Sequence, residues 1–174
     1  MSGELIYSET AERAVLSAAI INPGCIQEID LLPEDFYVER NRIIWNTLTS
    51  LSGRGIEPDY VTLTTSLEKQ GRLGDIGGEG YLMELLGDFG GNSFLFSQYA
   101  LSVKDYGRRR RVVQAAQALA TAAHDLKCNL DERTEQVIRS LVMDTNGKSG
   151  AVQISQAVSE FFDDLQIMTN ACIK

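Results

Sequence analysis

The stretch that decides the fold reads DYVTLTTSLEKQGRLGDIGGEGYLMELL and covers residues 59–86. Asp59 can accept the free backbone amides of a first helical turn, so a helix is predicted to begin directly after it. Gly71 suits the left-handed residue that ends such a helix. Gly77 and Gly78 permit a sharp reversal of the chain. The stretch therefore predicts a capped helix, a tight glycine turn and a second short helix.

The sequence before this stretch also repeats its apolar residues at helical spacing, and it contains no convincing alternating strand. Ser8 is placed to cap a first helix, and Asn22 with Pro23 starts a short second one. The turn that follows is predicted to bury Phe36. Another helix is predicted around Trp45, and it carries the apolar residues Ile43, Ile44, Leu48 and Leu51.

The second half of the chain predicts two helices that fold back on each other. Asn92 and Ser93 are placed to cap a long helix that runs to about Lys127. After a short break, Asp131 is placed to cap the next helix. Helices joined by so few residues form an antiparallel hairpin, and small alanines would let their backbones approach closely. The apolar residues are Val112, Ala116, Leu119, Ala123 and Leu126 on the first helix, and Val137, Ile138, Leu141 and Val142 on the second.

Gly107 lies inside the long helix, where a glycine costs about 1 kcal/mol relative to alanine. It is either a tolerated surface glycine or the place where the helix leaves the globular body. Beyond the hairpin, residues 146–150 read NGKSG and predict a connector. An apolar stripe then repeats at steps of four and three and predicts a helix that docks on another surface through Ile154, Val158, Phe161, Leu165 and Met168.

The predicted fold class is all-α, and a chain of 174 residues with 44% hydrophobic residues is long enough to bury a sizeable core. The predicted parts are a compact helical bundle, an antiparallel helical hairpin, a flexible connector and a C-terminal linker helix. Their bounds are residues 1–106, 107–145, 146–152 and 153–174, respectively.

Composition narrows the class of protein. The net charge of −8 argues against a general nucleic-acid binder, because such binding needs a surplus of Lys and Arg. Cys25, Cys128 and Cys172 are scattered, which predicts reduced thiols in a cytoplasmic protein. The sequence has neither a signal peptide nor the roughly 18 unbroken apolar residues of a membrane span.

No residue pattern predicts catalysis, a cofactor or a metal site. Gly147-Lys148-Ser149 matches the second half of a phosphate-binding loop, but the glycine expected five residues earlier is Val142, so a plain linker is predicted. The glycines between residues 74 and 80 do not follow a strand and predict a structural turn. His124 is the single histidine, near the end of a helix, and is interpreted as a surface residue. The chain is therefore predicted not to be an enzyme.

The arginine run, Arg108-Arg109-Arg110-Arg111, is the one dense basic segment. Four consecutive residues spread around most of a helix, so they surround it rather than forming a stripe. Two interpretations remain open. The arginines pair with acidic residues of this chain or of a partner protein, or they contact nucleic-acid phosphates.

In order and spacing, the landmarks between residues 8 and 142 resemble the N-terminal domain of the bacterial replicative DNA helicase, the DnaB family. They are Ala11-Glu12-Arg13-Ala14-Val15-Leu16, Glu34-Asp35-Phe36-Tyr37, Ile43-Ile44-Trp45, Asp59-x-Val61-Thr62, Leu67, Gly71-x-Leu73, Gly77-Gly78-x-x-Tyr81-Leu82, Asn92, Tyr99-Ala100 and the arginine run. Two positions depart from the pattern. Asn41 stands where the family often has histidine, and Ser17 where glycine is common, and both are interpreted as surface or packing changes.

The resemblance implies that these domains pair through their hairpins and form a ring, a trimer of dimers, above RecA-like motor domains. The self-association residues would be Val112, Ala116, Leu119, Ala123, Val137 and Leu141. ATP and Mg²⁺ would bind in the motor domain, which this sequence lacks, so no cofactor is expected here. The linker helix would dock on a neighbouring subunit's motor domain through Ile154, Val158, Phe161, Leu165 and Met168.

The resemblance also implies a scaffold that presents the hairpin to primase and, in some systems, to a helicase loader. By position, the partner-binding residues would be Arg109, Gln117, Lys127, Asp131, Arg133 and Gln136. DNA contact would be weak or indirect. Two alternatives remain: a stand-alone phage or plasmid relative that binds host replication proteins, and a small helical DNA-binding domain that uses the arginine run.

Overall fold

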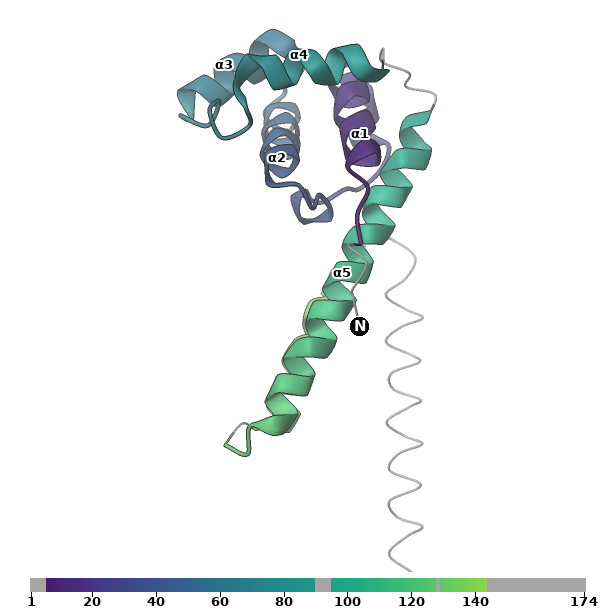
Figure 1. The fold of residues 1–174 in the computed structure, drawn as a ribbon, viewed down its shortest axis with the longest axis vertical. Coiled ribbons are helices and arrows are strands. Elements are labelled where there is room, and N and C mark those ends of the chain that lie inside the picture. Colours follow the sequence, from purple (N-terminus) through teal and green to yellow (C-terminus); the bar gives the residue numbers. More distant parts are fainter. Residues whose placement is uncertain (1–5, 90–94, 128, 144–174) are drawn as a thin grey trace, which may run out of the picture. The chain divides into compact units, whose positions relative to one another are not determined.

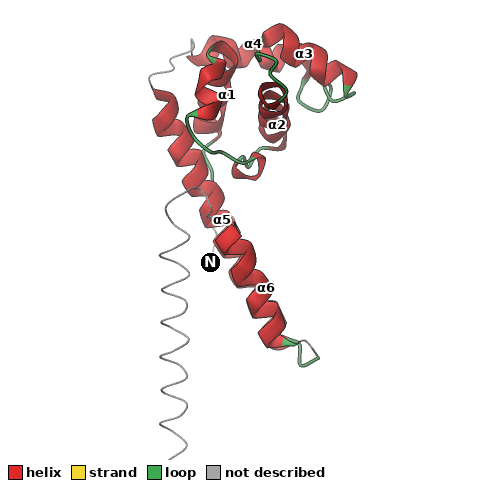
Figure 2. Cartoon of the chain, turned by 180° about the vertical axis from the view of Figure 1, so that it is seen from behind, coloured by secondary structure: helices red, strands yellow, loops and turns green. Residues whose placement is uncertain are grey.

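The computed structural model describes residues 6–89, 95–127 and 129–143. Every regular element in these ranges is helical, which confirms the predicted all-α class (Figure 2). The chain divides into two compact units, Met1–Arg110 and Arg111–Lys174. The division falls inside one long helix, four residues beyond the predicted end of the bundle at residue 106.

The first unit is a helical bundle. In Figure 1, α1 and α2 run beside each other, and α3 and α4 lie across their ends. Two short 3₁₀ turns join α1 to α2. The bounds are α1 Glu9–Ile21, η1 Pro23–Gln27, η2 Pro33–Asp35, α2 Glu39–Gly53, α3 Tyr60–Lys69, α4 Gly78–Phe89 and α5 Phe96–His124, of which the part up to Arg110 belongs to this unit.

The local chemistry of residues 59–86 is as predicted. The Asp59 carboxylate accepts the Thr62 amide at 2.7 Å, and the Thr62 hydroxyl accepts the Asp59 amide at 2.8 Å, which closes a reciprocal cap on α3. Gly71, just past the end of α3, has a φ of 67°. Gly77 and Gly78 have φ values of 95° and 74° and form the turn into α4. The predicted helix, glycine turn and second helix are confirmed.

The core of the bundle is continuous and lies where α1 packs against α2 and α4. Phe36 is fully buried, as predicted, and its ring lies 5.3 Å from that of Trp45. The Trp45 indole donates a hydrogen bond to the Leu31 carbonyl at 3.1 Å, so its one polar atom is satisfied inside the core. The largest fully buried side chains also include Leu16, Ile44, Leu48, Leu63, Leu67, Leu82, Leu85 and Phe96.

Gly107 is buried against η2, so its interpretation as a tolerated surface glycine is wrong. A Cβ at this position would lie 2.3 Å from the Asp35 carboxylate and 2.8 Å from the Asp35 Cα. Only glycine lets the backbone of α5 approach this closely. The boundary between the two units follows three residues later, after Arg110.

The second unit contains the end of α5, a short turn and α6 (Leu130–Met143). Asn129, and not Asp131 as predicted, caps α6: its side-chain oxygen lies 3.4 Å from the Glu132 amide, and its carbonyl accepts the Arg133 amide at 3.1 Å. Asp131 instead lies in the first turn, where its negative charge interacts favourably with the positive end of the helix dipole.

Several predictions fall outside the described residues: the cap at Asn92-Ser93, the connector at 146–152 and the linker helix at 153–174. Within the described part of the chain, no helix is both long and apolar enough to cross a membrane. The same residues contain no group of three or more His, Cys, Asp or Glu side chains that could hold a metal ion.

Candidate interaction surface

The hairpin carries a groove of about 390 Å³ whose walls come from both helices. Small and apolar side chains line it together with two guanidinium groups and two amides, and no carboxylate is among its described lining residues. Such a surface can take an amphipathic helix that has acidic side chains beside its apolar face. The lining residues are Arg111, Gln114, Ala115 and Ala118 from α5, and Arg133, Gln136, Val137, Ser140 and Leu141 from α6.

The six predicted self-association residues do not form one surface. Val137, 7% exposed, and the half-buried Leu141 line the groove. Val112 is 50% exposed on α5 and does not line the groove. Leu119 is half-buried, and Ala116 and Ala123 are exposed. The predicted stripe is therefore split between the groove and the outer surface of α5.

The face of α5 that borders α6 was not predicted. Ala115 and Ala118 line the groove, and Ala122 is only 8% exposed. We name these three residues the alanine stripe. Their spacing of three and four was visible in the sequence, but the parallel stripe one position further on, which contains Leu119, gave the stronger hydrophobic signal. Side-chain size was the better guide to the face that packs on a neighbouring helix.

The predicted partner-binding residues of the second unit are all exposed. Arg133 and Gln136 line the groove and are joined by a hydrogen bond of 3.2 Å. Gln117, Lys127 and Asp131 do not line it. Two of the five therefore share the groove with Val137 and Leu141.

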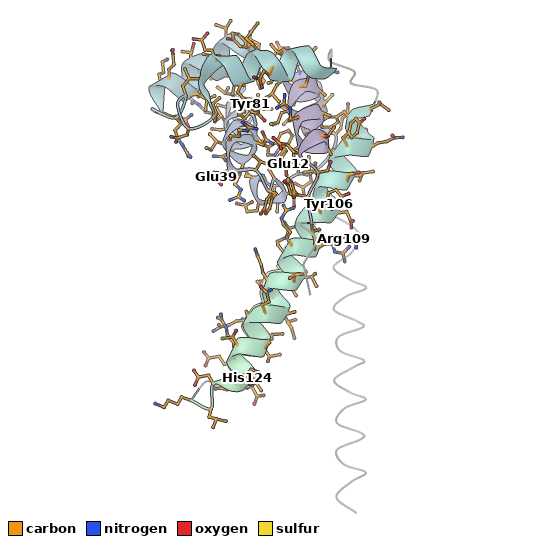
Figure 3. All side chains as sticks on the ribbon, viewed as in Figure 1. Glu12, Glu39, Tyr81, Tyr106, Arg109 and His124 are labelled. Atoms are coloured by element: carbon orange, nitrogen blue, oxygen red, sulfur yellow. The ribbon has the colours of Figure 1, made fainter. Side chains whose placement is uncertain are left out.

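The arginine run is largely engaged within the chain. Arg109, labelled in Figure 3, pairs with Asp105 one helical turn earlier at 2.6 Å. Arg110 donates to the carbonyls of Ile6 at 2.8 Å and Asp35 at 2.7 Å, and its guanidinium lies 5.5 Å from the centre of the Tyr37 ring. For these two arginines, the structure supports pairing within the chain.

A buried carboxylate in the first unit was not predicted. Glu12, on α1 and labelled in Figure 3, is 1% exposed and accepts the amides of Tyr37 at 2.7 Å and Val38 at 3.3 Å. Glu12 also accepts a hydrogen bond of 2.9 Å from the side-chain amide of Asn41. The side-chain oxygen of Asn41 in turn accepts a hydrogen bond of 2.6 Å from the Tyr81 hydroxyl. Burial raises the pKa of Glu12 above its ordinary value, although the hydrogen bonds from Asn41 and the two amides act in the opposite direction.

These contacts join α1, the start of α2 and α4 through one polar chain, which we name the Glu12 relay: Glu12, Asn41 and Tyr81. The guanidinium groups of Arg40 and Arg13 lie 4.0 Å and 5.2 Å from the centre of the Tyr81 ring. Burial raises the pKa of the Tyr81 hydroxyl. The relay is a structural device, because its members are enclosed and hydrogen-bonded to one another.

One signal in the sequence pointed to the relay. Glu12 shares a helical stripe with the buried Val15 and Leu16, three and four residues further on, so a carboxylate there must be satisfied inside the fold. Asn41 and Ser17, the two departures from the family pattern, are both fully buried. They are packing changes and not surface changes. His124 is exposed at the end of α5 (Figure 3).

Comparisons with known proteins agree with this geometry. The family described as "DnaB-like helicase N terminal domain" matches residues 4–105, more than half of the chain. Over 165 residues, the chain is 29% identical to the replicative DNA helicase DnaB of Geobacillus stearothermophilus and 24% identical to the replicative DNA helicase DnaC of Bacillus subtilis. Each alignment covers 92% of this chain and 36% of the relative, so the chain spans about a third of the length of these relatives.

Solved structures give the same family. The crystal structure of the N-terminal domain of DnaB helicase from Mycobacterium tuberculosis is similar with a TM-score of 0.70 and 25% identity, over 78% of this chain and 99% of that one. A structure of a DnaB-like replicative helicase and its interactions with primase is similar with a TM-score of 0.64 and 25% identity, over 87% of this chain and 35% of that one. This chain therefore belongs to the DnaB-like helicase N-terminal domain family.

Proposed function

We propose that this domain is the collar of a replicative DNA helicase: it assembles with copies of itself and docks primase through its hairpin. The observation that carries the proposal is the combination of family membership with a hairpin that exposes both an apolar helix face and an arginine-lined groove. Two surfaces of different chemistry suit two different partners.

Self-association is assigned to the outer surface of α5. Val112 and Val113 are 50% and 43% exposed, and Ala116 is also exposed. In the second unit, the described residues bury few apolar side chains, so pairing with a second copy would remove apolar surface from water that the hairpin cannot cover alone. In the proposed assembly, three such dimers form a ring.

Primase docking is assigned to the groove between α5 and α6. The similarity to a DnaB-like helicase studied with primase supports this assignment, as does the mixture of apolar and guanidinium groups that line the groove. In the proposed helicase, a loader uses the same hairpin, and the linker helix docks on a neighbouring motor domain. That motor domain binds ATP and Mg²⁺ and unwinds DNA in the cytoplasm.

Light scattering over a concentration series tests the self-association. We expect a dimer, or a dimer that grows toward a hexamer. Val112→Glu should shift the mass toward the monomer, because the charge would be buried without a partner. Val61→Glu is the matched control, because Val61 is 66% exposed on α3 and belongs to the first unit. A wild-type monomer at every concentration contradicts the self-association of this chain.

Calorimetric titration with primase tests the docking surface. Arg133→Glu places a carboxylate in the groove and should weaken binding at least tenfold. Arg139→Glu is the control, because Arg139 lies on the same helix but does not line the groove. Equal affinity of both variants and the wild type would remove the groove from the docking surface.

A further inference from the structure

The helix α5 has a weak point at the end of the part that belongs to the first unit. Gly107 lies in the helix interior, where glycine has a low helix propensity, and four arginines with like charges follow it directly. The close contact with Asp35 requires this glycine, so no better helix former can replace it. Residues 107–110 therefore depend on contacts with other parts of the fold to stay helical.

Arg110 makes such contacts with two separate parts of the chain. Its guanidinium donates to the carbonyls of Glu34 at 3.3 Å and Asp35 at 2.7 Å, beside the close approach of Gly107. It also donates at 2.8 Å to the carbonyl of Ile6, which lies 104 positions earlier in the sequence. Ile6 belongs to the segment that leads into α1 and runs beside α5 (Figure 1).

Residues 6–8, which we name the N-terminal strap, are held in place by two further contacts. Ser8 has an extended backbone, and its hydroxyl accepts the Ala11 amide at 3.2 Å, which caps α1. The ring of Tyr7 lies 4.4 Å from the ring of Tyr37, measured between their centres. The strap therefore presents the Ile6 carbonyl to α5 from a position that its two neighbours define.

The N-terminal strap can leave this position without opening the core. All three of its residues are only half-buried, and Tyr37, on which Tyr7 packs, is 41% exposed. The Arg110 guanidinium lies 5.5 Å from the centre of the same Tyr37 ring. A few surface contacts thus connect the strap to the weak point of α5, and such contacts open more readily than a buried core.

We propose that the N-terminal strap is a conformational lock on α5. With the strap in place, residues 107–110 are helical; when the strap is displaced, they lose their helical hydrogen bonds and form a hinge. Arg110 is the residue through which the strap acts. A partner that binds residues 6–8 would therefore open α5 at this point. The lock lies within the first unit and does not depend on the proposed function.

Hydrogen exchange on the full chain tests the lock. Tyr7→Ala should speed exchange of the amides of residues 107–110 about fivefold, because it removes the stacked ring that holds the strap. Tyr7→Phe is the matched control: it keeps the ring and should leave exchange unchanged. Amides of α2 should exchange at the wild-type rate in both variants. Unchanged exchange at 107–110 in Tyr7→Ala, or equal acceleration in α2, overturns the proposal.

A double variant tests the route from the strap to α5. Arg110→Gln removes the guanidinium, and Tyr7→Ala should cause no further acceleration at residues 107–110 in that background, because the strap acts through Arg110. Effects of the two substitutions that multiply would show that they act independently, which overturns this role of Arg110.

Trypsin measures the opening of the helix in a second way. Cleavage after the arginines at 108–111 requires an opened helix, so its rate should also rise about fivefold in Tyr7→Ala and stay unchanged in Tyr7→Phe. Fragment masses identify the cleaved bonds. Wild-type resistance in Tyr7→Ala would contradict the hinge. The light-scattering and primase assays do not depend on these results, so failure here is distinguishable from failure of the proposed function.

Discussion

Gly107 is a residue at which the first unit has no space for a side chain. We expect Gly107→Ala to lower the free energy of unfolding by about 3 kcal/mol, because the new Cβ would overlap the backbone of Asp35 as well as its side chain. Gly80→Ala is the control: Gly80 lies in α4, and a Cβ there meets nothing within 4 Å. Urea denaturation should show a large loss for the first variant and none for the second. Similar stabilities would contradict the close approach of α5 to η2.

Glu12 makes the stability of the bundle depend on pH. In the folded protein the pKa of Glu12 is raised above its ordinary value of 4.5. At a pH between 4.5 and this raised pKa, folded Glu12 holds a proton that the same residue has lost in the unfolded chain. Stability contributed by this residue is therefore full at low pH and falls as pH rises through that window.

We expect the difference in unfolding free energy between the wild type and Glu12→Gln to decrease as pH rises from about 4.5, because glutamine does not titrate. Urea titrations of both proteins at a series of pH values measure this difference, and other titrating groups cancel in it. A difference that grows with pH would mean that the hydrogen bonds to the carboxylate outweigh its burial.

At the scale of elements, Arg110 fixes the first part of α5 to the bundle. Its guanidinium spans the carbonyls of Ile6 and Asp35, and a lysine has neither the planar fork nor enough donors in that geometry. We expect Arg110→Lys to cost about 2 kcal/mol of stability. Arg109→Lys should be silent in the same thermal or urea denaturation, because Arg109 makes only an exposed ion pair. If Arg110→Lys lost no more stability than Arg109→Lys, the result would show that Arg110 acts by its charge alone.

The elements that could be predicted from the sequence are those governed by local chemistry. The cap at Asp59 and the turn at Gly77 depend on residues within four positions of each other, and both were confirmed. The cap on α6 was misplaced by two residues, because Asn129 and Asp131 are both good caps and the sequence does not choose between them.

Contacts distant in sequence were missed. The approach of Gly107 to Asp35 and the hydrogen bonds of Glu12 to the start of α2 join residues far apart in the chain, so no local pattern specifies them. In the hairpin, helical periodicity identified two helices but not which face of α5 borders α6. The alanine stripe and the predicted stripe at Ala116, Leu119 and Ala123 differ by only one position along the helix.

For the whole molecule, the two units should differ in their resistance to local unfolding. The continuous core lies in the first unit, whereas Ala122 and Val137 are the only buried hydrophobic residues among those described beyond Arg110. We expect amides of α2 to exchange far more slowly than those of α6 in dilute protein, and those of α6 to slow as the concentration rises and copies pair. Hydrogen exchange at two concentrations measures both effects. Equal rates in α2 and α6 at low concentration would contradict this expectation.

The direction of the Glu12 relay restricts how this domain can evolve. Asn41 donates to a carboxylate on one side and accepts a hydroxyl on the other, and histidine has the same pair of capacities in its neutral ring. Aspartate at position 41 would leave Glu12 without the hydrogen bond from Asn41, and leucine would remove the hydrogen bonds to both Glu12 and Tyr81 inside the core. In homologous domains, the residues that match positions 12, 41 and 81 should therefore covary, so that a substitution at one position is accompanied by substitutions at the others.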